Sequence, residues 1–198
     1  MAALRTQVFE RGQAMCKVKE ATMETMGVIR SRKSVRSYTG EPVSERELEL
    51  VLYAAQAAPV VMADYNKFHL TVITNLGLLY EIEQAGRNLV RGTFSHPLYG
   101  APMMILVSAQ IHPGRENTMY SSAAMIVHNM ALEATELGLG SCCIWYPIAA
   151  ILVCPETLDR LSLPEGFEPC CSIILGKTEE DFPERPVLTN RMPVHIIA

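Results

Sequence analysis

Apolar and polar positions alternate along the chain with two different periods, which predict a mixture of strands and helices. Period-two alternation from Phe68 to Thr74 predicts a half-buried strand. The unbroken apolar run from Met103 to Ala109 is typical of a strand that is buried on both faces. Two further strands are expected at Cys142–Trp145 and at Cys170–Leu175.

Helical spacing of apolar residues fills the segments between these strands. A first helix is expected from Thr22 up to the basic residues that follow Ile29. The capping-box pair Ser44 and Glu47 predicts the start of the next helix, which must end before Pro59. Further helices are expected at 76–91, at 117–137 and, as a short piece, around 156–161.

The order of these elements predicts an α+β layer structure. Residues 22–198 are expected to form a single domain, and residues 1–21 an N-terminal arm or helix that packs on a partner subunit. The helix at 117–137 is apolar nearly all round, so it belongs in the centre of the fold or in a dimer interface. Gly138 is expected to close this helix in the left-handed conformation.

Composition narrows the possible function classes. A net charge of −4 and an isoelectric point near 5.8 argue against a general nucleic-acid binder. No apolar stretch is long enough for a membrane span, and the first 25 residues contain charges throughout, so a cytoplasmic protein without a membrane partner is expected. Hydrophobic residues make up 49% and charged residues 19%, which favours an oligomer with a buried subunit interface.

The cysteines and histidines do not predict a metal site. The adjacent pairs Cys142–Cys143 and Cys170–Cys171 lack the two-residue gap of a zinc knuckle or a redox dithiol. Neighbouring residues of a strand face opposite sides, so each pair should place one thiol in the core and one elsewhere. The five histidines are scattered, and His128 is expected to be structural.

The run Arg30–Arg36 places four cations and two hydroxyls within seven residues. Guanidinium groups, an ammonium group and a serine hydroxyl together suit a phosphomonoester, although a solvated run of surface charge has the same composition. The chain lacks a nucleophile elbow, a P-loop and a dinucleotide-binding glycine motif. A phosphate cluster without a catalytic set of side chains suggests that a bound cofactor performs the reaction.

Four segments in order resemble the FMN-dependent nitroreductase family: 29–38 with the capped helix that follows, 99–102, 128–142, and 175–177 with Arg185. The resemblance covers about residues 23 to 190. It implies a mostly antiparallel central sheet flanked by helices, in an intertwined homodimer with FMN in the subunit interface. It also implies that NADH or NADPH reduces the flavin, which then reduces a small-molecule electron acceptor.

The resemblance also implies which residues contact FMN. Its phosphate and ribityl chain would be held by Arg32, Lys33, Ser34 and Arg36, with Arg185 and Lys177 closing the phosphate site. The ring would be contacted by Pro59, Val60 and Val61 of the partner subunit, by Asn66, and by the segment Ile144, Trp145 and Tyr146. A main-chain N–H of Trp145 or Tyr146 would donate to the flavin N5, and no side chain is expected to be catalytic.

The sequence leaves several alternatives open for the function and for the roles of single residues. The family usually has small hydroxylated residues where this chain has Val60 and Val61, so the chain could be a flavin-binding store or sensor without efficient turnover. The basic cluster could also bind another phosphorylated ligand. Trp145 could be core filler, and Lys177 and Arg185 could be exposed charges. The preferred hypothesis is an oxidoreductase that reduces a nitroaromatic, a quinone or a similar electrophile by a ping-pong mechanism.

Overall fold

The computed structural model describes residues 24–89, 96–188 and 190–197. Its strands form one sheet in the order β1-β2-β4-β3, and each neighbouring pair is antiparallel. The predicted α+β fold with an antiparallel sheet is therefore confirmed. The predicted arm at 1–21 lies outside the described residues. The strands are β1 (Phe68–Ile73), β2 (Met103–Ala109), β3 (Gly140–Ile144) and β4 (Glu168–Gly176).

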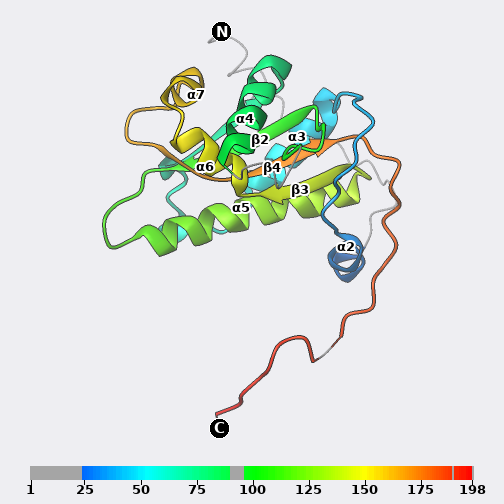
Figure 1. Cartoon of the computed structure of the whole chain (residues 1–198). Helices are drawn as coiled ribbons and strands as arrows, with labels where there is room; N and C mark the ends of the chain where they lie inside the picture. Colours follow the sequence, from blue (N-terminus) through cyan, green and yellow to red (C-terminus); the bar gives the residue numbers. More distant parts are fainter. Residues whose placement is uncertain (1–23, 90–95, 189, 198) are drawn as a thin grey trace.

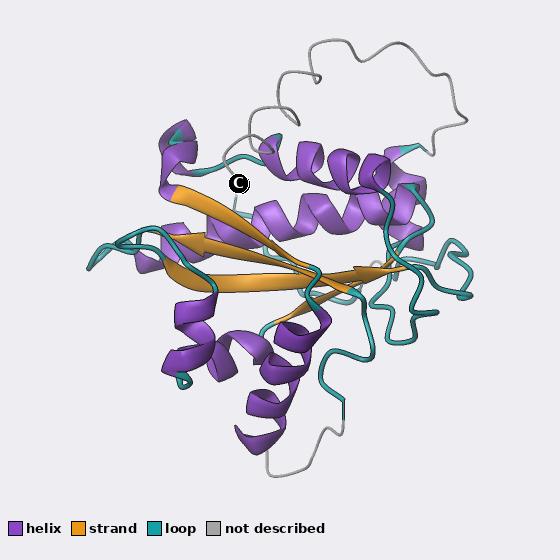
Figure 2. Cartoon of the chain, turned by 90° about the horizontal axis from the view of Figure 1, so that it is seen from above, coloured by secondary structure: helices purple, strands orange, loops and turns teal. Residues whose placement is uncertain are grey.

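Helices cover both faces of the sheet (Figures 1 and 2). Helices α3 and α5 lie on one face, and α4 and α6, with α7 packed against them, lie on the other. The bounds are α2 (Thr25–Ser31), α3 (Glu45–Gln56), α4 (Leu76–Leu89), α5 (Glu116–Glu136), α6 (Tyr146–Leu152) and α7 (Pro155–Arg160), with two short 3-10 turns, η2 (Val61–Ala63) and η3 (Tyr65–Lys67). Among the described helices, none has the length and apolar character that crossing a membrane requires.

The core has two layers because the side chains of a strand alternate between its faces. Ile105 and Val107 of β2 pack toward α3 and α5, whereas Met104 and Leu106 pack toward α4 and α6. Every residue of β2 is buried, as the unbroken apolar run predicts. Each large aliphatic side chain buried in this way stabilises the fold by about 1.5–3 kcal/mol.

The predicted helix ends are confirmed where the sequence contains a specific capping residue. The Glu47 main-chain N–H donates to Ser44 Oγ over 3.3 Å, and the Ser44 N–H donates to Glu47 Oε2 over 2.9 Å, which completes the capping box. Gly138 follows the last turn of α5 with φ of +68°, as expected for a glycine that ends a helix.

Two local predictions are wrong. Cys170 and Cys171 are both buried on the same side of β4, because a β-bulge opposite Val107 and Ser108 leaves Cys170 without a facing residue. Trp145 does not belong to a strand: β3 ends at Ile144, and Trp145 is the N-cap of the unpredicted helix α6.

The segment that follows α2 lies along the outer edge of β3. The Val35 N–H donates to the Ser141 carbonyl over 2.8 Å. Tyr38 packs over the facing pair Gly140 and Gly176, and its hydroxyl donates to the Val35 carbonyl over 3.0 Å. A Cβ at position 176 would lie only 2.8 Å from the Tyr38 ring, so glycine is required there for the ring to fit.

Gly176→Ala should therefore lower the free energy of unfolding by about 1–3 kcal/mol, because the new Cβ would lie 2.6 Å from the Pro102 ring as well as against Tyr38. Urea denaturation measures this change. Gly77→Ala is the matched control, since its Cβ would meet only the Asn75 side chain at 3.2 Å. Equal stability of both variants and the parent would contradict the packing argument.

Candidate functional site

The basic run divides into two groups, and the first group holds the extended segment after β4. Arg30 pairs with Glu184 at 3.0 Å, and Lys33 pairs with Glu180 at 2.8 Å. The Lys33 ammonium also lies 5.4 Å from the centroid of the Phe182 ring. This segment, residues 177–188, is called the tail here, and Figure 1 shows it leaving β4 and passing α2.

The second group consists of Arg32, Ser34 and Arg36, which converge on Cys142 of β3. Burial raises the pKa of the Cys142 thiol, while the charges of Arg36 and Arg32 and a hydrogen bond with Ser34 act against this rise. In the part of the chain that the structure describes, neither Arg32 nor Arg36 pairs with a carboxylate; Arg36 lies 5.8 Å from the Tyr99 ring centroid. Two guanidinium groups and a hydroxyl are thus available to an anion.

His128 of α5 lies close to Arg32, whose charge disfavours the protonated imidazole. Burial and the neighbouring charge of Arg32 both lower the pKa of His128. The sequence indicated only a structural histidine here, because the pattern along α5 does not show that Arg32, nearly a hundred residues earlier, lies beside it.

The tail brings Arg185 to the second group. The Arg185 main-chain N–H and its Nε both donate to the Arg30 carbonyl, over 3.2 and 3.0 Å, and a terminal nitrogen donates to the Arg32 carbonyl. Arg185 therefore lies next to the predicted phosphate residues although it is distant in sequence.

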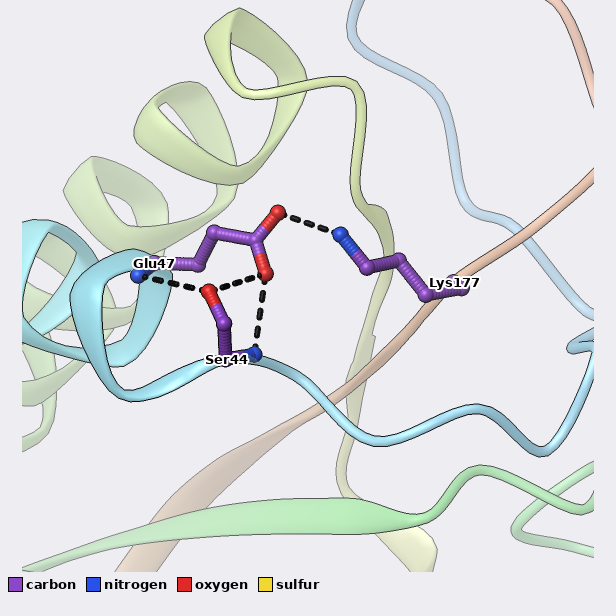
Figure 3. Close-up of polar contacts among 3 residues, drawn as sticks. All are labelled: Ser44, Glu47 and Lys177. Atoms are coloured by element: carbon purple, nitrogen blue, oxygen red, sulfur yellow. Dashed lines mark hydrogen bonds and ion pairs between the residues drawn. The ribbon is translucent and has the colours of Figure 1, made fainter.

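Lys177 lies in a different environment. It follows β4, and its ammonium group pairs with Glu47 at the start of α3 (Figure 3). Burial opposes ionisation of Glu47, but hydrogen bonds from Lys177 and Ser44 outweigh it and lower the pKa of Glu47 below its ordinary value. Lys177 thus links the sheet to the capping box of α3.

The three predicted ring residues after β3 have different surroundings. The Ile144 side chain is buried in the core next to α6. The Tyr146 hydroxyl donates to the Gly86 carbonyl of α4, so this side chain points into the protein. Trp145 is 57% exposed, and its ring centroid lies 6.4 Å from that of Tyr120 on α5, a contact that sequence analysis missed.

Pro59, Val60 and Val61 line a shallow cavity of about 370 Å³ beside the first half of α5. The Val61 N–H donates to Ser122 Oγ over 3.0 Å. Because residues 120 and 122 point about 160° apart around a helix, Val61 and Trp145 lie on opposite flanks of α5. A single chain therefore does not bring Val60 and Val61 to Trp145. Asn66, the remaining residue predicted to contact the ring, is exposed in η3.

The model of the nitroreductase family matches residues 29–177, which include the basic run, the whole sheet and α5. The chain belongs to the nitroreductase family. The match begins at Ile29 and ends at Lys177. The tail beyond Lys177 therefore lies outside the family match, and its contacts come from the structure of this chain.

Individual nitroreductase-family relatives agree with this assignment. An FMN reductase [NAD(P)H] of Bacillus subtilis is 24% identical over 193 residues, which cover 87% of this chain and 73% of the relative. A nitroreductase with bound FMN from Desulfitobacterium hafniense is 25% identical with a TM-score of 0.76. A second FMN-bound nitroreductase, from Bacteroides fragilis, is 26% identical with a TM-score of 0.72. Each of the two structural comparisons covers 88% of this chain and all of the solved chain.

Glu47 should contribute a pH-dependent part of the stability of this nitroreductase-family chain. Its pKa is lowered from an ordinary value of 4.5, so its contribution is present above about pH 4.5 and is lost as the pH falls through the lowered pKa. Glu47→Gln should flatten the acid limb of unfolding free energy against pH and cost roughly 1 kcal/mol at pH 7.

Urea denaturation between pH 3 and pH 7 measures this effect. Glu45→Gln, which removes an exposed carboxylate from the same helical turn, is the matched control and should leave the acid limb unchanged. An acid limb that is the same in Glu47→Gln and the parent would refute the assigned role of Glu47.

Proposed function

We propose that this chain is an FMN-dependent oxidoreductase that accepts hydride from NADH or NADPH and reduces a quinone, nitroaromatic or similar small electrophile by a ping-pong mechanism. The observation that carries the proposal is the group of Arg32, Ser34 and Arg36 around Cys142, in which both guanidinium groups lack a carboxylate among the described residues. Family membership and the FMN bound in two similar structures support the phosphate of FMN as the matching anion.

The length of β3 fits this ligand. Ser141, which pairs with Val35 of the basic segment, is four residues before Trp145, a distance of about 13 Å along an extended strand. An extended phosphoribityl chain can bridge such a distance, with the phosphate near Arg32 and the ring near Trp145. The phosphate end and the ring end of the site are thus held by the two ends of one strand.

The contributions of the chain are binding and orientation. Arg32, Ser34, Arg36 and Arg185 would hold the phosphate by charge-assisted hydrogen bonds. When bound, FMN supplies hydride acceptance from the nicotinamide and donation to the second substrate. A main-chain N–H of Trp145 or Tyr146, at the junction of β3 and α6, would donate to the flavin ring and orient it.

Lys33 and Lys177 have another task in this proposal. Both ammonium groups already pair with carboxylates, Glu180 and Glu47 respectively, so we assign them to holding the tail and α3. This reduces the predicted phosphate set to the cations that have no carboxylate partner among the described residues.

A homodimer completes the site. Ser121, Ala124, Met125 and His128 form an exposed strip of α5 between the flank with Val61 and the flank with Trp145. A second copy packed on this strip would place Val60 and Val61 of the partner subunit over the ring site. The chain end beyond Arg185 also exposes apolar side chains that a subunit interface would cover: Val187, Leu188, Met192, Val194, Ile196 and Ile197.

Steady-state turnover tests the proposed activity. The FMN-loaded protein should oxidise NADH or NADPH in the presence of a naphthoquinone with a kcat on the order of 1–100 per second, and double-reciprocal plots should give the parallel lines of a ping-pong mechanism. The control is free FMN at the same concentration. Turnover no faster than this control with either nucleotide would refute the enzyme and favour a flavin store or sensor.

A further inference from the structure

Tyr120 and Trp145 form an exposed aromatic pair whose side chains have no role in the proposed function. Their ring centroids are 6.4 Å apart and their planes are inclined by 48°, within the range of attractive aromatic contacts. Trp145, the single tryptophan of the chain, is 57% exposed and Tyr120 is 36% exposed. Two neighbouring rings with uncovered surface can bind a further flat apolar molecule.

The pair lies at the ring end of the proposed FMN site. Cys143, two residues before Trp145 on the same strand, is exposed and lies near Arg32. Partial burial raises the pKa of the Cys143 thiol, and the charge of Arg32 acts against this rise. A strip therefore runs from Arg32 past Cys143 to Trp145, with the cations at one end and the aromatic pair at the other.

The charges near the pair have the opposite sign from those at the phosphate end. Partial burial raises the pKa of Tyr120, and the neighbouring Cys170, Glu168 and Glu116 raise it further. Glu116 and Glu168 are exposed carboxylates, and the described residues place no cation in an ion pair with either. An anionic molecule on the rings would be repelled, whereas a neutral one would not.

We propose that Tyr120 and Trp145 determine the choice of electron acceptor by stacking a flat, uncharged aromatic molecule beside the flavin ring. This inference rests on the proposed function, because it assigns a role within the same site. The pair acts on binding of the acceptor, and a bicyclic quinone such as menadione should be favoured over its sulfonated, anionic analogue. Reduced FMN would supply the hydride and become oxidised, and water would supply the proton that completes the hydroquinone, so neither side chain is assigned a proton transfer.

The single tryptophan gives a direct binding assay. Without a nucleotide donor, menadione cannot turn over, so its binding to the FMN-loaded protein is followed by quenching of Trp145 fluorescence. Tyr120→Leu should weaken menadione binding three- to tenfold and should reduce the preference over menadione sulfonate. Tyr80→Leu, which removes a more exposed tyrosine from α4 on the opposite face of the sheet, should leave both dissociation constants unchanged.

Two binding outcomes would overturn the inference. One is an unchanged menadione affinity in Tyr120→Leu, and the other is equal affinity of the parent for menadione and its sulfonate. Size-exclusion chromatography with light scattering is run on the same samples. A Tyr120→Leu protein that binds menadione normally but no longer associates would assign the pair to the subunit interface instead.

Reoxidation kinetics separate this inference from the proposed function. The FMN-loaded protein is reduced with dithionite and mixed with menadione or with ferricyanide, which accepts electrons without stacking. Trp145→Leu should lower the ratio of the two second-order rate constants at least fivefold. An unchanged ratio would refute the role of the pair alone, whereas a parent protein that retains no FMN would refute the proposed function.

Discussion

The attachment of residues 32–38 to the edge of β3 is the constraint on which the site depends. It combines one main-chain hydrogen bond, Val35 to Ser141, with the Tyr38 ring on the Gly140–Gly176 pair. An extended segment alternates its side chains, so Arg32, Ser34 and Arg36 can share a side while Lys33 points to the tail. The same attachment fixes the phosphate end of the site relative to Trp145 at the other end of β3.

The tail explains how an acidic chain keeps an open anion site. Its carboxylates, Glu180 and Glu184, pair with Lys33 and Arg30, while Arg185 adds a cation beside Arg32. Each exposed ion pair contributes no more than about 1 kcal/mol, so the tail is held by several weak contacts acting together. Contacts between segments more than 150 residues apart in sequence thus decide which cations of the run remain available for a ligand.

Sequence alone predicts the elements whose signal is local. The apolar run of β2, the Ser44–Glu47 capping box and Gly138 at the end of α5 were all identified from their own residues. The bulge at Cys170 was not, because it depends on the register between β4 and β2. The division of the cations, the pairing of Lys177 with Glu47 and the Tyr120–Trp145 contact are long-range contacts, which no periodicity in the sequence specifies.

The central claim is that Arg32 and Arg36 hold the phosphate of FMN, and a comparison of FMN with riboflavin tests it most directly. Both ligands are titrated into the apo-protein by fluorescence. The parent should bind FMN at least a hundredfold more tightly than riboflavin, since only FMN has the phosphate. Arg32→Ala with Arg36→Ala should abolish most of this difference, while Arg30→Ala, whose side chain pairs with Glu184, should preserve it. Equal FMN preference in the double variant and the parent would contradict the account.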